Sequence, residues 1–588
     1  MSDKEYNLID EPWIMVLMVS GERREMGLRE VFSRAHEIKA IAGEMETQNA
    51  SIFRLLLAIL YAVHLRKDVD GNPVDIWDEN DAVGYWKRLW DRGRFNTDLF
   101  DEYFDGCYDR FYLFHPDRPF YQANIEKGTE YAASKMIGEL YQSANKPKLF
   151  APVSGDGSAS MSYAQSARWI LNINSFDDAA LKQQDKSDGS RSTKVGWLGR
   201  IGYVCILGCN LFETLMYNMV LTDKTGEPFK DGKAIWESES IQTKERVTIP
   251  IPGSPVELLT VQFRRIRLIR ENGRVIGSKV VAGDIFDQSC SNIEQMTMWK
   301  KDKDTGNWIP KTHDPSKSAW RDYPSLLVRG EDKLSPGVIR WASALEKKGL
   351  IEKQNLLISL VGVQYGSMMS SMDDATEDSI SISSRLLSDL GYEWNHRIEQ
   401  VLESTDECMK AYSGFRYRVF VLNGISEGVK DSIWGRVDQD RAKIYFEMDG
   451  AFRTWLSSID PDNDDMEARM NDWLKGKLRP IMIAAGNRAI GDSNLRSLSV
   501  HKQDSDGSVL DELRKFKNAI FKITGGRNDN IQRCEELCRL QDSQDIHGGS
   551  EVHGHVGHSA PRCGKTDGRL PRDLGNGPVG HPREPARA

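Results

Sequence analysis

Residues 355–382 read NLLISLVGVQYGSMMSSMDDATEDSISI and lie just before the C-terminal third of this 588-residue chain. The stretch opens with an apolar run, continues through a loop of small residues and methionines, and ends in an acidic run. Glycine lets a backbone approach another molecule closely, and methionine is an unbranched side chain that fits between flat groups. The alternative is an ordinary connection whose methionines pack in the core. The candidate residues for insertion into a groove are Gly366, Ser367, Met368 and Met369.

The composition is that of a folded protein with more than one domain. A chain of 588 residues exceeds one ordinary hydrophobic core, and 39% apolar content with 15 Trp and 18 Tyr is ample for a packed body. The formal net charge of -9 argues against a protein coated with phosphate-binding residues. Any nucleic-acid surface is therefore expected to be a local basic groove.

The sequence gives no sign of a membrane segment, a secretory signal or a metal site. No run of about 18 apolar residues occurs, and the N-terminus lacks a basic segment followed by an apolar core. Eight cysteines are sparse for this length, and neither a CxxC pair nor an HExxH motif is present. We therefore expect a cytoplasmic protein without a metal or other cofactor.

Periodicity predicts an α+β fold in which a large mixed N-terminal domain, residues 1–385, is followed by a C-terminal four-helix bundle, residues 386–525. Apolar residues recur every three or four positions over 46–65, which predicts a helix, and Asn272-Gly273 is a strong hairpin signal. Four amphipathic segments follow residue 390, as in a helix bundle. The last segment, 526–588, is rich in Gly, His, Pro and Arg, a composition typical of disorder.

Two short motifs in the N-terminal part are distinctive. Residues 7–14 read NLIDEPWI, in which a turn signal separates apolar positions, and residues 111–122 read FYLFHPDRPFYQ, an aromatic run broken by two prolines. In this order, ahead of a helical C-terminal region, they resemble the CasA family, the large subunits of type I-E CRISPR Cascade complexes. The resemblance extends over most of the chain, from about residue 7 to about residue 524.

The resemblance implies a non-enzymatic subunit of a multi-subunit antiviral-defence complex. Members of that family read the protospacer-adjacent motif (PAM) on duplex DNA, promote unwinding and R-loop formation, and help to recruit a separate helicase-nuclease. The implied partners are the other Cascade subunits, the CRISPR guide RNA, double-stranded target DNA and the helicase-nuclease acting in trans.

The resemblance also gives the opening loop a specific role. The family places a glutamine wedge under the PAM at the turn that corresponds to residues 366–368, and Ser367 is nearest to that position. A serine cannot fill the gap left by a base pair, so the wedge role passes to Met368 or Met369, because apolar side chains are known wedges between base steps.

Three further loops carry candidate contacts. By resemblance, Lys300 or Lys301 projects into the minor groove beside the PAM, whereas the alternative is a solvated charged hairpin. The loop over 138–169 resembles the one that reaches the guide RNA and a neighbouring subunit, and its charged and aromatic tip could also be merely solvated. A GxxGxxG segment fits neither a dinucleotide fingerprint nor a P-loop, and it either approaches DNA or is a plain turn. The candidate contacts in the loop over 138–169 are Asn145, Lys146, Lys148 and Phe150. Those in the GxxGxxG segment are Gly196, Gly199 and Arg200.

Two other charged segments allow alternative interpretations. The strands flanking Asn272-Gly273 carry six basic residues that could bind phosphates or simply cover a solvated face. The acidic run after the methionines could serve a stand-alone metal-dependent nuclease or hydrolase, although carboxylates crowded into one loop are better explained by a solvated turn. The acidic residues are Asp373, Asp374, Glu377 and Asp378, and the basic ones are Arg264, Arg265, Arg267, Arg270, Arg274 and Lys279.

Overall fold

The computed structural model describes most of the chain up to residue 525. The described residues are 4–138, 141–143, 146–147, 159–184, 190–191, 193–239, 246, 248–328, 330, 332–351, 354–424, 430–491, 493, 495–498 and 507–525. Within these ranges no helix is both long enough and apolar enough to cross a bilayer. The tail predicted over 526–588 lies outside the described residues.

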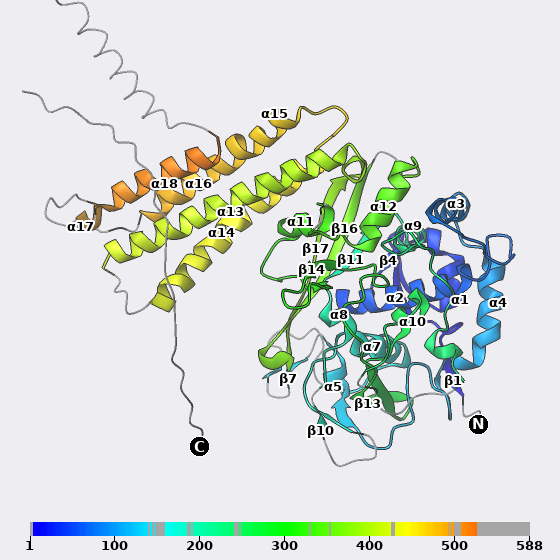
Figure 1. The fold of residues 1–588 in the computed structure, drawn as a ribbon. Coiled ribbons are helices and arrows are strands. Elements are labelled where there is room, and N and C mark those ends of the chain that lie inside the picture. The colour runs from blue at the N-terminus through cyan, green and yellow to red at the C-terminus, as the bar shows by residue number, and fades with distance from the viewer. Residues whose placement is uncertain are drawn as a thin grey trace, which may run out of the picture. The chain divides into compact units, whose positions relative to one another are not determined.

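A buried helix, α2 (Glu46–His64), forms the centre of the N-terminal part and confirms the helix expected over 46–65 (Figure 1). Its side chains are buried on all sides over nearly the whole length, as in the core of a large domain. It packs against α7 (Tyr163–Phe176), α9 (Leu211–Asn218) and α10 (Pro255–Thr260). This arrangement explains why α2 carries apolar residues around most of its circumference.

The two distinctive motifs are neighbours in space. Strand β1 (Glu5–Asn7) pairs antiparallel with β5 (Tyr112–Phe114), so that Asn7 lies opposite Tyr112. The Asn7 side-chain amide also donates to the Tyr108 carbonyl oxygen at 3.0 Å. The fully buried Trp13 anchors the first motif, because its indole N–H donates to the Leu8 carbonyl oxygen at 2.9 Å. Each motif therefore stabilises the other across a sequence separation of about a hundred residues.

The strands form several small antiparallel sheets. Hairpin β12–β13 turns at Asn272 and Gly273, which have φ of +49° and +73°, as the Asn-Gly signal predicts. The three-stranded sheets have the orders β3-β2-β4, β12-β13-β6 and β11-β16-β17, and β14–β15, β7–β8 and β9–β10 are two-stranded. Their strands are β2 Ile14–Met18, β3 Arg23–Met26, β4 Ile38–Ile41, β6 Thr129–Ala132, β7 Tyr141–Ser143, β8 Lys146–Pro147, β9 Lys182–Gln183, β10 Ser190–Arg191, β11 Tyr203–Leu207, β12 Arg264–Glu271, β13 Arg274–Ala282, β14 Met298–Lys301, β15 Trp308–Lys311, β16 Asn355–Tyr365 and β17 Met372–Ser383.

Shorter helices surround these sheets and confirm an α+β fold (Figure 1). Asp78 and Asn96 cap two of them by accepting backbone N–H groups of Asp81 and Asp98, the usual role of Asp and Asn at a helix start. The remaining N-terminal helices are α1 Leu28–Ser33, α3 Glu79–Trp90, α4 Thr97–Cys107, α5 Ala133–Met136, α8 Trp197–Arg200, α11 Tyr323–Leu327 and α12 Gly337–Lys347.

Long helices form the C-terminal part, as the amphipathic pattern predicts. The third of the four segments is one continuous helical run over 466–489, whose middle turn is a π-helix. Aromatic side chains fill the space between the helices, with the Phe415 and Phe516 rings stacked at 4.8 Å. The helices are α13 Gly391–Leu422, α14 Lys430–Ser457, α15 Met466–Asn471, α16 Arg479–Ala489, α17 Leu495–Leu498 and α18 Val509–Ile523.

The helical part is joined to the preceding sheet by specific polar contacts. Arg453 on α14 pairs with Asp378 on β17 at 2.8 Å, and the Trp320 indole N–H donates to Asp449 at 2.9 Å. The domain boundary expected between residues 385 and 386 falls in a 3₁₀ turn, Ser384–Leu387. The division into two domains stays a prediction.

Candidate nucleic-acid interface

The stretch that opens the sequence analysis is a long antiparallel hairpin, β16–β17, in which Leu356 pairs with Ile382 and Gly362 with Thr376 (Figure 1). The first strand continues to Tyr365, so only residues 366–371 form the turn. The acidic run, expected in a loop, is part of strand β17, and that expectation was wrong. Cross-strand pairing with β16 outweighs the low strand propensity of aspartate here.

The turn of this hairpin presents two methionines to solvent. Met368 and Met369 are 89% and 54% exposed, so the alternative in which they pack in the core is wrong. Both adopt left-handed backbone conformations, with φ of +53° and +55°. Such a conformation costs about 1–3 kcal/mol at a residue other than glycine, and it persists only where the surroundings hold it. The tip is therefore a positioned element that exposes most of Met368 and about half of Met369 to solvent.

Hydrogen bonds within the tip and to a neighbouring segment hold this conformation. The Met369 N–H donates to the Gly366 carbonyl oxygen at 2.9 Å, and the Gly366 N–H donates to that of Ser371 at 2.9 Å. Outside the hairpin, the Ala179 N–H donates to the Met369 carbonyl oxygen at 2.8 Å. The Tyr365 hydroxyl donates to the carbonyl oxygen of Phe176, the last residue of α7, at 2.6 Å. These last two bonds join the hairpin tip to the end of α7 and to the segment that follows it.

The predicted glycine-rich loop packs against the same place. A Cβ on Gly199 would lie 2.0 Å from the Tyr365 hydroxyl oxygen, and one on Gly196 would lie 2.4 Å from the Ser175 carbonyl group. Neither position has room for a larger residue. The two glycines are thus needed where the loop meets α7 and the hairpin, which is a packing role that the sequence alone did not reveal.

Arg200, the third residue predicted in that loop, is half-buried on α8. Its guanidinium lies 5.4 Å from the centre of the Trp197 ring and donates to the Gln288 side-chain oxygen at 3.2 Å. Burial lowers the pKa of Arg200, and its buried Nη1 atom has no hydrogen-bond partner among the described residues. The side chain keeps one unused donor, and its predicted approach to DNA stays a prediction.

A buried cluster of charges supports the segment that holds the tip. Arg264 is completely buried, pairs with Asp177 at 2.5 Å, and donates to the carbonyl oxygens of Asp178 and Lys194 at 2.7 and 2.8 Å. Lys182 lies 3.3 Å from Asp177 and 2.9 Å from Asp178. Burial by itself raises the pKa of Asp177, but Lys182 and Arg264 outweigh that effect and hold it at about 2. Asp177 is therefore ionised throughout the neutral range.

The basic hairpin β12–β13 does not form a phosphate-binding stripe. Arg265 is fully buried and pairs with Asp284 at 2.6 Å, and Arg267 donates to the Asn124 side chain at 2.7 Å. Arg274 and Lys279 donate to Ser160 and to the Glu126 carbonyl oxygen, while Arg270 pairs with Glu5. With Arg264 buried as well, all six basic side chains are engaged within the protein. The phosphate-binding interpretation has no support here.

The predicted minor-groove lysines lie on a separate hairpin, β14–β15. Both side chains are exposed, and residues 302–307 form the turn beyond them. Lys301 pairs with Asp332 and lies 5.4 Å from the centre of the Trp308 ring. Lys300 has no ion pair among the residues that the structure describes. Lys300 is thus the better candidate of the two for contact with a phosphate or a groove.

This second hairpin is attached to the same framework as the methionine tip. Thr297 bridges to Tyr203 on β11, and the His313 ring nitrogen Nε2 lies 2.9 Å from the Tyr203 carbonyl oxygen. A Cβ on Gly362 of β16 would lie 3.0 Å from the His313 Cβ. The sheet β11-β16-β17 therefore contains the β16–β17 hairpin in its own strands and supports the β14–β15 hairpin at its edge.

The loop predicted to contact guide RNA is described only at its base. Lys146 lies in the two-residue strand β8, opposite Ser143 of β7, and β7 lies against β17. Asn145, Lys148 and Phe150 lie outside the described residues. Their predicted contacts stay predictions.

The four carboxylates of the alternative hydrolase do not converge. Asp374 and Asp378 share one face of β17, about 13 Å apart along the strand, whereas Glu377 is on the other face. Asp378 pairs with Arg453, and Glu377 accepts from the Ser359 hydroxyl at 3.0 Å. Burial is the main cause that raises the pKa of Glu377, and the negative charge of the nearby Glu46 is the second. Among the described residues, no three His, Cys, Asp or Glu side chains are grouped as metal ligands.

The residues that position the tip were not found from the sequence. Tyr365 ends the apolar run that the sequence analysis singled out, so its aromatic ring at a strand end was an available signal. Ala179 acts only through its backbone N–H, and Phe176 only through its carbonyl oxygen. No side-chain pattern could have revealed those two contacts.

A family model described as CRISPR-associated protein Cse1 matches residues 7–482 of the chain. A curated relative from Thermus thermophilus, described as CRISPR-associated protein CasA/Cse1, is 30% identical over 339 residues. That match covers 56% of this chain and 62% of the relative, so it spans less than two thirds of the relative's length.

Solved structures share the fold. The Cse1 structure from Thermobifida fusca is similar with a TM-score of 0.72 at 23% identity, covering 88% of this chain and 98% of that one. Cse1 from Acidimicrobium ferrooxidans gives 0.71 at 21% identity, covering 88% and 99%. A chain of a structure described as a CRISPR RNA-guided surveillance complex gives 0.62 at 15% identity, covering 88% and 99%.

Proposed function

Because the chain belongs to the Cse1 (CasA) family of CRISPR-associated proteins, we propose that it is the large, non-enzymatic subunit of a type I-E RNA-guided surveillance complex. In this proposal it recognises the PAM on duplex DNA, promotes unwinding and R-loop formation, and helps to recruit the helicase-nuclease. Guide-RNA pairing then supplies the sequence specificity, and the protein reads only the short motif and the duplex shape, a division of labour known from other RNA-guided systems.

The observation that carries the proposal is the tip of the β16–β17 hairpin. Met368 is 89% exposed in a left-handed conformation that neighbouring segments hold in place. An exposed apolar side chain on a fixed turn has the properties of a wedge that enters between base steps and unstacks them. Met369 is the second candidate, and Gly366 with Ser367 shapes the turn.

Lys300 supports the same function by charge. Its exposed ammonium has no ion pair among the described residues, and a minor groove of negative potential attracts such a group. The degenerate pattern of acceptors in that groove permits tolerant recognition of a motif. Lys301, already paired with Asp332, would have to exchange that partner for a phosphate or base.

The remaining partner contacts are assigned by resemblance to the family. We assign the guide RNA or a neighbouring subunit to Asn145, Lys146, Lys148 and Phe150, and a DNA-proximal position to Gly196, Gly199 and Arg200. The packed glycines suit a supporting role for that segment, because a Cβ on Gly199 would displace the tyrosine that ends β16.

The test uses the assembled complex and compares target binding with target unwinding. Met368→Ala should leave duplex binding within about twofold and reduce unwinding, measured by permanganate reactivity of thymines next to the PAM. Met368→Asn tolerates the left-handed backbone but removes the apolar side chain, so it should behave like the alanine variant. Leu510→Ala, at a 50% exposed position on α18, is the matched control and should unwind normally.

Two results would overturn the proposal. Normal unwinding in Met368→Ala, and in the double variant that also carries Met369→Ala, would make the tip a spacer. Cleavage of duplex DNA by the purified chain with Mg²⁺ or Mn²⁺, abolished in Asp373→Ala, would show a metal-dependent nuclease instead.

A further inference from the structure

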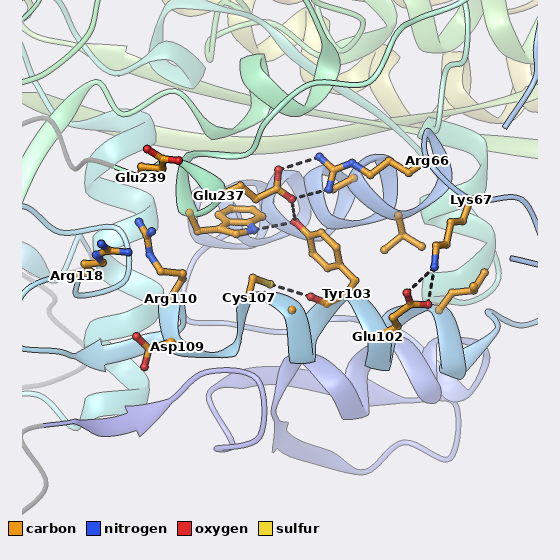
Figure 2. A pocket seen from close by; sticks show the side chains of 15 residues that line it. Arg66, Lys67, Glu102, Tyr103, Cys107, Asp109, Arg110, Arg118, Glu237 and Glu239 are labelled. Carbon is orange, nitrogen blue, oxygen red and sulfur yellow. Dashed lines mark hydrogen bonds and ion pairs between the residues drawn. The ribbon is translucent and has the colours of Figure 1, made fainter. Parts of the chain in front are cut away.

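A pocket lies between the end of α2 and helix α4, away from the β16–β17 hairpin (Figure 2). Its volume is about 590 Å³, which is within the range of small-molecule sites. Ala62, Val63, Leu99 and Trp236 supply apolar surface, and most of the remaining lining residues are charged. None of the candidate nucleic-acid contacts that the structure describes lines this pocket.

Most charged groups around the pocket already have partners. Arg66 binds Glu237 at 2.7 Å and Lys67 binds Glu102 at 2.6 Å (Figure 2). Arg66 also binds Asp231 at 2.9 Å. The Tyr103 hydroxyl donates to Glu237 at 2.7 Å. These ion pairs fix the walls and leave little excess charge on that side.

Two arginines at the opposite end are different. Arg110 and Arg118 lie side by side in Figure 2, and neither forms an ion pair with any residue that the structure describes. Arg110 is half-buried and, within the described part of the chain, its side chain donates to the Ser238 carbonyl oxygen at 2.8 Å, whereas Arg118 is exposed. Burial, and then the neighbouring Arg118, lowers the pKa of Arg110. An anion bridging the two guanidinium groups would remove this repulsion.

The geometry of these guanidinium groups favours phosphate. Arginine presents a planar fork of N–H donors that binds phosphate or carboxylate oxygens in pairs. A long polyanion fits the site poorly, because Glu102, Asp109 and Glu239 also line it. Carboxylates do accept hydrogen bonds from sugar hydroxyl or base amino groups. In Figure 2 Asp109 and Glu239 lie beside the two arginines, whereas Glu102 lies at the far end with Lys67, so the lining suits a small molecule that carries both an anionic group and hydrogen-bond donors.

We propose that this pocket binds a free nucleotide, with its phosphate on Arg110 and Arg118 and its donor groups toward the carboxylates. The proposal is independent of DNA reading by the hairpin tip. A nucleic-acid terminus carries the same phosphate chemistry, so the experiment must separate the two sources.

The experiment is calorimetric titration of the full chain with ADP, inorganic pyrophosphate and a 5′-phosphorylated oligonucleotide. ADP should bind saturably at one site, and pyrophosphate more weakly. Arg118→Ala should weaken ADP binding about tenfold or more, the usual size of a charge-assisted hydrogen bond. The ADP affinity of Arg118→Lys should lie between those of the parent chain and of Arg118→Ala, because lysine keeps the positive charge but lacks the planar fork of donors.

Arg397→Ala is the matched control, since Arg397 is exposed on α13 and donates to the Gln400 side-chain oxygen at 3.1 Å. It should bind ADP like the parent chain. Because Arg118 is exposed and unpaired within the described structure, its removal should not unfold the protein, and the melting temperature without ligand checks this. The proposal is overturned if ADP does not saturate, if Arg110→Ala with Arg118→Ala binds as well as the parent, or if only the oligonucleotide binds.

Discussion

At the scale of single residues, the tip of β16–β17 depends on backbone atoms as much as on side chains. Met368 and Met369 supply exposed apolar surface, but their left-handed conformations are held by backbone hydrogen bonds, in which Met369 donates to Gly366 and accepts from Ala179. The Tyr365 hydroxyl adds a contact to the end of α7. The position of the tip and the apolar character of its side chains therefore depend on different atoms, and a substitution can change one without the other.

Tyr365→Phe should loosen the tip without removing it. The change leaves the Phe176 carbonyl oxygen without its hydroxyl partner, which costs about 1–3 kcal/mol. Hydrogen exchange of the amides in residues 366–371 and at Ala179 should become faster, measured by mass spectrometry on the full chain.

Tyr61→Phe is the matched control for this change. The Tyr61 hydroxyl also donates to a carbonyl oxygen, that of Val220, at 2.8 Å, but it lies on α2. The control should lose comparable stability while exchange at the tip stays unchanged. Equal hydrogen-exchange rates at the tip in Tyr365→Phe and Tyr61→Phe would show that the Tyr365 hydroxyl does not hold the tip.

At the scale of elements, the segment after α7 is the point where α7, β12 and the hairpin meet. Arg264 on β12, Asp177 after α7 and Lys182 on β9 form one buried charge cluster. Removing one partner of a buried ion pair strongly destabilises the folded protein, because the other charge stays buried without a partner. This cluster therefore fixes the backbone from which Ala179 reaches the tip.

The stability supplied by Asp177 should depend on pH. Its pKa in the folded protein is about 2, below its ordinary value of 3.8, so the contribution is complete above pH 3.8 and is lost as the pH falls toward 2. The full shift corresponds to about 2 kcal/mol, of which about 1 kcal/mol is lost between pH 7 and pH 3.

Urea unfolding of the parent chain and of Asp177→Asn checks this dependence. Asparagine cannot ionise, so the difference in unfolding free energy between the two proteins should narrow by about 1 kcal/mol from pH 7 to pH 3. A difference that stays constant, or that widens with acid, would rule out the ionised aspartate as its source.

At the scale of the whole molecule, the net charge of -9 argues against a surface coated with phosphate-binding residues. The arginines of β12–β13 are used inside the fold, whereas Lys300 stays exposed on a separate hairpin. On a protein of net negative charge, such an exposed lysine favours orientation of the duplex at one place over coating of the duplex. The predicted DNA surface is therefore small.

Lys300→Ala in the assembled complex should weaken binding of PAM-containing duplex. If Lys300 contacts one phosphate, the slope of log affinity against log salt concentration should fall by about 1. Assembly with guide RNA should not change. Lys443→Ala, at an exposed position on α14, is the control and should keep the parent slope. An unchanged slope in Lys300→Ala would show that this side chain does not contact the backbone.

The sequence by itself determined the element types and the family resemblance. Apolar spacing gave α2 and the C-terminal helices, Asn272-Gly273 gave a hairpin, and the two N-terminal motifs pointed to the Cse1 family. These features are local, because helix periodicity and turn chemistry depend on neighbours a few residues apart. Exposure of the methionines was likewise open to inference from their small, polar flanks.

Only the tertiary structure decided which charges are free and what holds the tip. Arg264 and Lys300 look alike in the sequence, yet one is buried against Asp177 and the other is exposed. The acidic run became a strand because β16 lies beside it, and Gly199 is required because Tyr365 lies against it. The physical reason is that burial and pairing join residues far apart in the chain, and a local pattern does not encode such partners.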